Sequence, residues 1–182
     1  MRVITGSAKG ARLASLSGND VRPTAERVKE AVFSIIQFDI EGRRVLDLFG
    51  GSGQMGIEAL SRGAESAVFL DSSAESVNVI NRNLKVTGLL DKAQVVKRDY
   101  KMYLGGTSDV FDIAFIDPPY YAGFYESALT LTAKRMSDYG VMFCEHPSDV
   151  SVPTNVGGFT AVKDYRYGKI FITVYRREEN VQ

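Results

Sequence analysis

Apolar runs typical of buried strands alternate with helical spacing along most of the chain. They follow one another as strand 44–49, helix 56–62, strand 66–70, helix 74–86, strand 93–97, a short helix near Tyr103, strand 111–116, helix 124–136 and strand 140–144. Such an alternation predicts a parallel sheet with helices on both faces. A helix from Thr24, the N-cap after Pro23, to about Phe38 is predicted before it, after a small hairpin or arm at 3–16.

The end of the chain breaks this pattern. Residues 159–165 and 169–175 are predicted to be two strands joined around Tyr167 and Gly168, with no room for a helix between them. Strands connected so closely predict an antiparallel β-hairpin. The expected fold class is therefore α/β: a Rossmann-like, mostly parallel sheet closed by a C-terminal antiparallel hairpin.

The bulk properties fit one globular domain in the cytoplasm. The chain has 182 residues, 45% of them hydrophobic and 24% charged, and this length can bury a core without disulfides. No apolar run approaches the roughly 18 residues of a membrane helix, and the basic start lacks the apolar core of a signal peptide. Cys144 is the only cysteine, which argues against a disulfide or a metal cluster.

Charge is unevenly distributed although the net charge is zero. Residues 1–30 carry six basic and three acidic side chains, residues 163–177 carry five and one, and residues 45–162 carry nine and fourteen. Basic ends around an acidic middle predict that the termini contact a polyanion. Ordinary scatter of surface charge is the alternative.

A glycine-rich loop follows the first strand of the alternation. Gly51, Gly53 and Gly56 satisfy G-x-G-x-x-G, a spacing that lets the backbone approach a nucleotide, although such turns also occur for packing reasons. Asp47 stands four residues before Gly51, where a carboxylate would repel a pyrophosphate. It would attract the cationic amino-acid end of a ligand, so the loop favours a sulfonium nucleoside over NAD.

Acidic residues also follow the next two strands. Asp71 ends the second strand and can accept both ribose hydroxyl hydrogens. Asp99, followed by Tyr100, comes after the third strand and can accept from an adenine amino group. Carboxyl ends of parallel strands share one edge, so these acids and Asp47 are expected to line one crevice. The alternative for each acid is a helix N-cap.

The fourth strand ends in the tetrapeptide Asp117-Pro118-Pro119-Tyr120. An aromatic exocyclic amine is a poor nucleophile because its lone pair is delocalised into the ring. The Asp117 carboxylate and the Pro118 carbonyl can accept its two N–H bonds and favour a tetrahedral nitrogen, while Tyr120 stacks on the base and holds it in line. The alternative is a strand terminator whose acid caps the next helix.

These motifs resemble class I methyltransferases that act on amino groups of nucleic-acid bases, and a longer set resembles the RsmD family. That set comprises residues 1–6 (MRVITG), 22–24 (RPT), 27–30 (RVKE), 47–53 (DLFGGSG) and 167–169 (YGK). The resemblance implies a seven-stranded class I methyltransferase sheet in a domain at 23–182, after a basic arm at 1–22. It implies methyl transfer from S-adenosylmethionine to N2 of one guanine in small-subunit (16S) ribosomal RNA.

The resemblance also assigns roles to individual residues. It implies cofactor contacts for Asp47, Phe49, Gly51, Gly53, Asp71, Asp99, Tyr100 and Asp117; base contacts for Asp117, Pro118 and Tyr120; and RNA contacts for Arg2, Lys9, Arg12, Arg22, Thr24, Arg27 and Lys169. No metal is expected. The implied partner is ribosomal RNA in a small-subunit assembly particle, bound by a monomer away from membranes. Two mild departures, Gly50 for a commoner Ala and Asp71 for a frequent Glu, leave the chemistry unchanged.

The basic arm is expected to clamp RNA, together with Lys29, Lys163 and Arg166. Methylation of N2 requires the guanine to leave its stack, so contacts elsewhere on the RNA must supply free energy. Removal of residues 1–20 is then expected to leave the fold and the cofactor site intact while methylation falls. The alternative is an arm that packs on the sheet, whose loss unfolds the domain.

Other functions stay open on the sequence. The tetrapeptide recognises an amino group, so adenine N6 or a small molecule could be the acceptor. An NAD-dependent oxidoreductase would use the glycine spacing, and a non-catalytic RNA-binding module would use only the basic ends. Cys144 and His146 share a strand face, but a nucleophile pair needs a third orienting group. Tyr121 and Tyr125 could border a base pocket.

Overall fold

The computed structural model describes residues 1–16, 23–120 and 123–177, with the backbone alone for 23–25. One eight-stranded sheet runs through this part of the chain in the order β3-β2-β1-β4-β5-β8-β7-β6. Its strands are β1 (Arg44–Leu48), β2 (Ser66–Asp71), β3 (Ala93–Lys97), β4 (Phe111–Ile116), β5 (Met136–Pro147), β6 (Asn155–Val156), β7 (Phe159–Tyr167) and β8 (Ile170–Arg177). The first five pair in parallel, and β5 through β8 pair antiparallel. The predicted fold class is confirmed.

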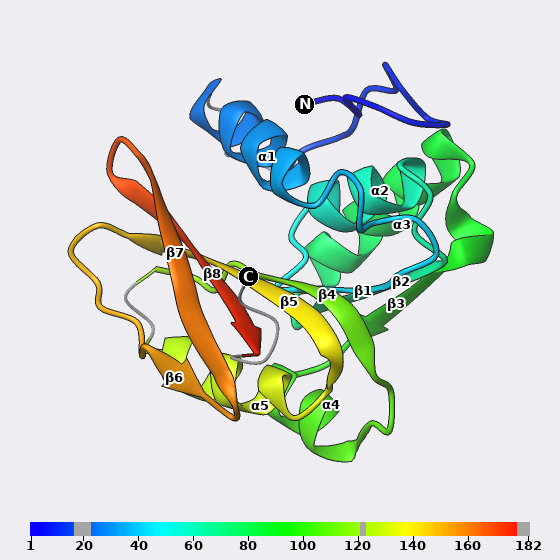
Figure 1. The fold of residues 1–182 in the computed structure, drawn as a ribbon. Helices are drawn as coiled ribbons and strands as arrows, with labels where there is room; N and C mark the ends of the chain where they lie inside the picture. Colours follow the sequence, from blue (N-terminus) through cyan, green and yellow to red (C-terminus); the bar gives the residue numbers. More distant parts are fainter. Residues whose placement is uncertain (17–22, 121–122, 178–182) are drawn as a thin grey trace.

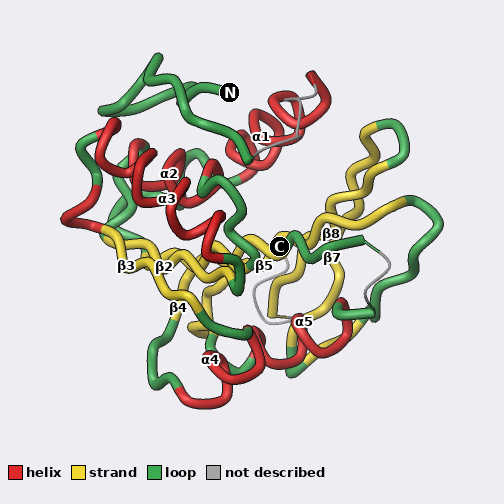
Figure 2. The backbone as a smooth tube through the Cα atoms, turned by 180° about the vertical axis from the view of Figure 1, so that it is seen from behind, coloured by secondary structure: helices red, strands yellow, loops and turns green. Residues whose placement is uncertain are grey.

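Helices cover both faces of the sheet (Figure 1). They are α1 (Pro23–Ile35), α2 (Gln54–Ser61) and α3 (Ala74–Thr87) on one face, and α4 (Tyr100–Gly106) and α5 (Tyr125–Ala133) on the other, with a 3-10 turn at Leu90–Lys92. The view from behind shows the same two layers (Figure 2). None of the helices in the described ranges is long and apolar enough to cross a membrane.

Each helical layer has its own core, because strand side chains alternate between the two faces. Beneath α1–α3 the core includes Val45, Phe69 and Phe115. Beneath α4 and α5 it includes Leu46 and Leu70, the strand neighbours of Val45 and Phe69. The inner parallel strands β1, β2 and β4 are largely buried on both faces, which explains why they appear in the sequence as apolar runs.

Three boundaries differ from the sequence prediction. The first helix begins at Pro23 and ends at Ile35, so Thr24 is inside the helix and is not its N-cap. The fifth strand is far longer than 140–144: it begins at Met136, which pairs with Phe111 across a register shift, and α5 ends earlier, at Ala133. The sheet has eight strands and not the expected seven: the additional strand, β6, is only two residues long, too short to leave a periodic pattern.

The N-terminal segment is a small hairpin that packs on α2. Its backbone amides at Val3 and Leu13 donate to Ala11 O and Met1 O, each at 3.0 Å. Gly6 approaches α2 so closely that a Cβ there would lie 1.7 Å from Ser61 O. Val3, Ala8 and Leu13 belong to the core beneath α1–α3. This hairpin is therefore part of the domain's core, as the alternative to a free arm predicted.

Candidate functional site

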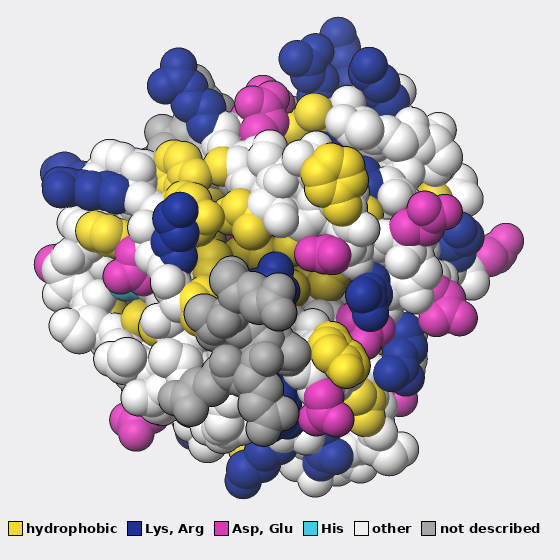
Figure 3. Space-filling model, viewed as in Figure 1, with side chains coloured by type: hydrophobic (Ala, Val, Ile, Leu, Met, Phe, Trp, Pro, Cys, Tyr) yellow, Lys and Arg dark blue, Asp and Glu magenta, His cyan; other side chains and the backbone are white. Residues whose placement is uncertain are grey.

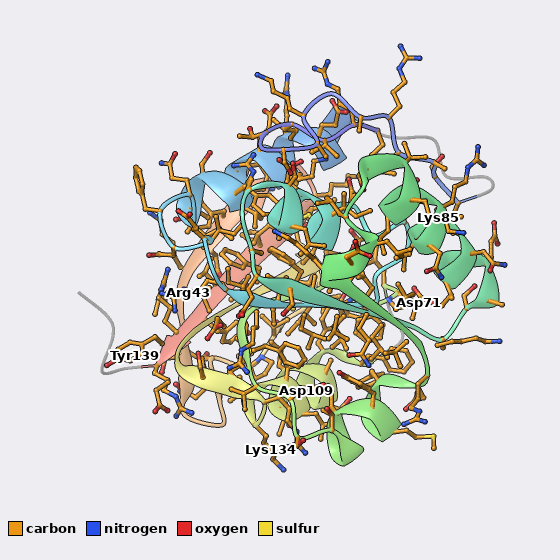
Figure 4. All side chains as sticks on the ribbon, turned by 90° about the vertical axis from the view of Figure 1, so that its right-hand side faces the viewer. Arg43, Asp71, Lys85, Asp109, Lys134 and Tyr139 are labelled. Carbon is orange, nitrogen blue, oxygen red and sulfur yellow. The ribbon has the colours of Figure 1, made fainter. Side chains whose placement is uncertain are left out.

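The carboxyl edge of the parallel strands collects the acids singled out in the sequence. Asp47 lies in β1, Asp71 ends β2, and Asp99 and Asp117 follow β3 and β4. Figure 4 shows Asp71 on the opposite side of the view from Arg43, the residue that precedes β1 at the amino edge. The structure thus brings these acids to one edge, as a parallel sheet requires.

The glycine loop turns β1 into α2 with left-handed backbone at two of its glycines. Gly51 has φ 57° and Gly53 φ 77°, and Gly53 N donates to Gly50 O at 2.7 Å. Gly56 has a different role: a Cβ there would lie 2.3 Å from Phe69 Cε1. The first two glycines shape the turn and the third allows close packing of α2 on β2, and a nucleotide contact at Gly51 and Gly53 stays a prediction.

Asp47 lies directly behind this loop. Its side chain is 4% exposed, and Oδ2 accepts a hydrogen bond from Gly56 N at 2.9 Å. Burial raises the pKa of Asp47 to about 7, against the hydrogen bond from Gly56, and the charge of Asp71 raises it further. None of the ion pairs among the described residues involves Asp47. A buried carboxyl with no cationic partner fits a ligand that brings a positive charge.

A second acceptor beside the loop also lacks a donor. Gln54 follows Gly53 as the first residue of α2, and its Oε1 is buried without a hydrogen-bond partner among the described residues. Buried polar atoms are almost always paired, so this one fits a ligand that carries an N–H or O–H. Gln54 was not predicted to belong to the site, because a glutamine next to a glycine loop has no distinctive spacing.

Asp71 joins the glycine loop to the neighbouring strand. Its Oδ2 accepts from Gly51 N at 3.0 Å and its Oδ1 from Ser73 N at 2.8 Å. The N-cap of α3 is Ser73, whose hydroxyl oxygen accepts from Ser76 N. The N-cap alternative for Asp71 is therefore wrong. Each carboxylate oxygen can accept a second bond, so a ribose contact stays a prediction.

Asp99 caps a helix, as its alternative predicted. Its Oδ1 accepts from Lys101 N at 2.9 Å and from Met102 N at 3.3 Å, at the start of α4. Both bonds use the same oxygen, and the side chain is exposed. Asp99 can therefore cap α4 and still offer Oδ2 to a ligand, and the predicted adenine contact is untested.

Three aromatic rings gather next to the glycine loop. Phe49 lies 5.1 Å from Tyr100 and 6.3 Å from Phe124 between ring centroids, and it is stacked on the latter with an interplanar angle of 7°. Phe49 has φ 66°, the only positive value at a non-glycine residue of the described chain. Such a backbone costs roughly 1–2 kcal/mol, which indicates that the fold holds Phe49 against that strain. Phe124 was not predicted to belong to this group.

The tetrapeptide follows β4, and its tyrosine is tied to the next strand. Tyr120 Oη donates to Glu145 Oε1 at 2.7 Å, and the Tyr120 side chain is 41% exposed. The partner strand places Glu145 here, because Ile116 pairs with Cys144 in the β4–β5 register. Glu145 was not predicted from the sequence. The available signal was an acid directly after an apolar strand, at the same edge as Asp117.

The carboxyl groups of Asp117, Glu145 and Asp47, which come from three neighbouring strands, are close enough to affect the pKa of Asp117. Crowding by protein atoms raises the pKa of Asp117 well above its usual value, and the charges of Glu145 and Asp47 raise it further. Because the side chain of Asp117 still reaches solvent, crowding contributes less than it would in a closed core. Burial also raises the pKa of Glu145, opposed by the hydrogen bond from Tyr120. Crowding, with the negative charges of Glu145 and Asp47, therefore makes the pKa of the Asp117 carboxyl higher than that of a free aspartate.

Cys144 and His146 do not form a nucleophile pair. Cys144 is fully buried, and burial, with Asp117 and Glu145 nearby, raises the pKa of its thiol. The two ring nitrogens of His146 lie 2.8 Å from Thr173 Oγ1 and 3.1 Å from Pro147 O, and its ring stacks on Phe171. A thiol held in its protonated form is a poor nucleophile. Tyr125 is buried, and Tyr121 lies outside the described residues.

Basic side chains are spread around the face in Figure 3, and some of them lie over the N-terminal hairpin, α1 and the β7–β8 tip. The residues predicted to contact RNA include several exposed ones: Arg2, Lys9, Arg12, Arg27, Lys163, Arg166 and Lys169. Arg22 and the side chain of Thr24 lie outside the described residues. Lys29, expected to contact RNA, is 1% exposed and donates to Arg2 O at 2.6 Å. That expectation is wrong, because a buried and partnered ammonium cannot reach a phosphate.

Comparison with known proteins agrees with this arrangement. Residues 1–176 match the family described as "Conserved hypothetical protein 95". The chain is 36% identical to YlbH of Bacillus subtilis (strain 168) over 182 residues, which cover 97% of this chain and 99% of that protein. It is 29% identical to ribosomal RNA small subunit methyltransferase D of Haemophilus influenzae over 181 residues, which cover 97% and 93%.

Solved structures give the same relationship. The Escherichia coli methyltransferase-fold protein yhhF superimposes with a TM-score of 0.85 at 28% identity, over 98% of both chains. The family match spans the N-terminal hairpin, the glycine loop, the tetrapeptide and both long C-terminal strands. The chain is therefore a member of the RsmD family of class I methyltransferases.

Proposed function

We propose that this protein transfers a methyl group from S-adenosylmethionine to the N2 amino group of one guanine in small-subunit ribosomal RNA. One observation carries the proposal: Asp117-Pro118-Pro119-Tyr120 lies at the same sheet edge as the glycine loop and the buried Asp47. That arrangement combines acceptors for an amino group with a site for a cationic nucleoside. We further propose that the protein acts in the cytoplasm, as a monomer, on an assembling small-subunit particle.

The residues around the glycine loop fit the methyl donor. Asp47 would hold its amino group, because that carboxyl is buried without a cation. Gly51 and Gly53 would let the backbone approach it closely, and Asp71, anchored by Gly51 N, would accept from the ribose hydroxyls. Phe49 would flank the adenine with Asp99. The bound donor supplies an electrophilic methyl group on a sulfonium centre.

The tetrapeptide would prepare the amino group of the base. The Asp117 carboxylate and the Pro118 carbonyl each accept one N–H of N2, which draws the nitrogen lone pair out of the ring. The Tyr120 side chain is 41% exposed, and its ring would stack on the base. When the nitrogen gains its methyl group it must lose a proton. Asp117 is placed to take that proton, and its raised pKa favours this role.

Electrostatics disfavour the oxidoreductase alternative. A pyrophosphate bound at Gly51 would lie next to two acids, Asp47 and Asp71, and Asp71 Oδ2 already occupies Gly51 N. A dinucleotide needs that backbone N–H for its phosphates. S-adenosylhomocysteine should therefore raise the melting temperature of the protein, and NAD should not.

Mass-spectrometric mapping of ribosomal RNA tests the proposed function. In small-subunit RNA from a strain that lacks the gene, one position that carries N2-methylguanosine in the wild type should carry unmodified guanosine. Re-expression of the gene should restore N2-methylguanosine at that position. A strain that re-expresses Asp117→Ala should resemble the deletion. The proposal fails if the deletion leaves every N2-methylguanosine of the small subunit in place, and N6-methyladenosine loss would support the adenine alternative.

A further inference from the structure

Glu145 is a carboxylate of this site with no role in the mechanism described so far. It follows Cys144 in β5, and its side chain is half-buried. Its Oε1 accepts from Tyr120 Oη at 2.7 Å. The hydrogen bond joins Glu145 directly to the tetrapeptide, so it lies where the target base is expected to bind.

Strand geometry places Glu145 beside Asp117. Ile116 of β4 pairs with Cys144 of β5, so Asp117 and Glu145 come next on adjacent strands, which are about 4.8 Å apart in a sheet. Phe143 packs beneath α1–α3, and side chains alternate along a strand, so Glu145 projects toward that same face. The influence of the Glu145 charge on the pKa of Asp117 agrees with this proximity.

We infer that Glu145 accepts the N1–H of the target guanine, next to the N2 amino group held by Asp117, and so selects guanine over adenine. The inference rests on the proposed function and extends it to the choice of base. The Asp117-Pro118-Pro119-Tyr120 motif cannot make that choice, because it recognises only an amino group.

The pattern of donors on the base explains the selectivity. Guanine presents N1–H and N2–H₂ side by side, three hydrogens for which the Glu145 carboxylate, the Asp117 carboxylate and the Pro118 carbonyl are the acceptors. Adenine presents an amino group next to a bare N1, and Glu145 would place an acceptor against that acceptor. A site whose buried polar groups are left unpaired rejects such an analogue strongly. Tyr120 donates to Oε1, and the inference assigns the other carboxylate oxygen, Oε2, to the base.

Two RNA substrates can isolate this contact. One carries guanosine at the nucleotide found by mass-spectrometric mapping, and the other carries 2-aminopurine riboside there. 2-Aminopurine keeps the 2-amino group but has a bare N1 acceptor. The wild-type protein should prefer guanosine by about 100-fold or more. Glu145→Gln should lower transfer to guanosine by roughly 10–100-fold. The same variant should lower transfer to 2-aminopurine far less, or raise it, because the glutamine amide can donate to N1 of that base. The preference of the enzyme for guanosine over 2-aminopurine should therefore shrink at least about tenfold.

Controls separate recognition from folding. Glu41→Gln makes the same chemical change at an exposed residue before β1, at the opposite edge of the sheet, and should leave the preference unchanged. Tyr120→Phe keeps the ring but removes the hydroxyl that holds Glu145, and should reduce the preference in part. S-adenosylhomocysteine affinity should be unchanged in Glu145→Gln.

The outcomes distinguish this inference from the proposed function. Equal losses on both substrates in Glu145→Gln would show a merely structural role and overturn the inference, with the proposed function intact. A wild-type protein that methylates neither substrate would overturn both. A preference that falls in Glu145→Gln and persists in Glu41→Gln supports the assignment of Glu145 to N1–H.

Discussion

Asp47 carries its carboxyl group where burial opposes its charge. Burial removes the water that normally stabilises an ionised carboxylate. Among the described residues, one backbone N–H, that of Gly56, is the only hydrogen-bond donor to it. The pKa of about 7 means that the ligand-free protein holds a proton on Asp47 near neutral pH part of the time. A cationic amino group would stabilise the carboxylate and displace that proton.

Cofactor affinity should therefore depend on pH through Asp47. Below about pH 7 the proton must leave before the amino group can bind, so S-adenosylhomocysteine affinity should fall as pH drops from 8 to 6. The loss approaches tenfold per pH unit well below the pKa. Calorimetry in buffers of different ionisation enthalpy counts the released proton. Asp47→Asn should bind more weakly and show little of this dependence; wild-type affinity that is flat from pH 6 to 8 would contradict the assignment.

Asp117 is expected to contact both the cofactor and the base, and its main role is expected at the target amino group. Asp117→Ala should slow methyl transfer by roughly 100-fold or more, because a charged acceptor at the reacting nitrogen is removed. S-adenosylhomocysteine affinity should change little. Single-turnover methyl transfer and calorimetry measure the two effects. Asp91→Ala, at an exposed residue of the 3-10 turn, is the matched control and should behave as wild type. Near-normal turnover of Asp117→Ala would refute its role.

At the scale of elements, the packing of α2 on β2 positions the glycine loop and the carboxylate of Asp47. The helix begins directly after the glycine loop, with Gly53 as a left-handed N-cap and no side-chain cap. It packs on β2 through Gly56 against the Phe69 ring, and Gly56 N also binds Asp47. The position of the helix and the position of the buried carboxylate are therefore coupled.

Gly56→Ala should disturb both at once. Its Cβ would lie 2.3 Å from Phe69 Cε1 and 2.7 Å from Cζ, so the helix or the ring must move. Overpacking of this kind costs about 1–3 kcal/mol, or several degrees in Tm for a chain of this size. Cofactor affinity should fall as well. Gly105→Ala in α4, where a Cβ meets nothing within 4 Å, is the control and should keep Tm. Equal Tm values for the two variants would contradict the packing argument.

At the scale of the whole molecule, the N-terminal hairpin and the sheet form one core. Glu58 of α2 is fully buried, and its carboxylate accepts from Ile4 N at 2.8 Å and Thr5 N at 3.0 Å. Lys29 of α1 binds Arg2 O from the other side and pairs with Glu58 at 3.7 Å. Because the buried charges of Lys29 and Glu58 have hydrogen-bond partners in the hairpin, the hairpin contributes to the stability of the domain.

Removal of residues 1–13 should therefore destabilise the domain. It exposes Lys29 and Glu58 without their backbone partners and removes three core side chains, Val3, Ala8 and Leu13. The expected loss is on the order of 3 kcal/mol or more, seen as a lower Tm with and without S-adenosylhomocysteine. A truncated protein with wild-type Tm would instead support the free clamp that the sequence suggested.

The RNA role of the hairpin can be tested without removing it. Arg2, Lys9 and Arg12 are exposed, so their combined change to Ala should keep Tm. RNA affinity should fall, and the slope of log affinity against log salt should become shallower by roughly 0.7–0.9 for each phosphate that the protein no longer neutralises. Unchanged affinity and slope would move the RNA contact to the β7–β8 tip, where Lys163 and Arg166 lie over aromatic rings.

Local chemistry made much of this protein predictable from its sequence. The β4 bounds, the alternation from β1 to β5 and the C-terminal hairpin follow from periodicity and turn residues, which act between neighbours in the chain. The carboxyl edge follows as well, because parallel strands must end together. Asp47 and Asp117 could be placed there on that basis, since each stands at the end of a recognisable strand.

Only the tertiary structure decided the contacts that join distant segments. Ile4 and Thr5 meet Glu58 more than fifty residues away, and Tyr120 meets Glu145 across two strands, without any local pattern that marks these pairs. The arm was therefore predicted to be free and Glu145 was missed. Packing likewise decided the different roles of Asp71 and Asp99. Each stands at the carboxyl end of a strand, but only the Asp99 carboxylate accepts hydrogen bonds from the first amides of a helix. Periodicity reports what a residue faces along its own element, whereas partners across the core are set by how the elements assemble.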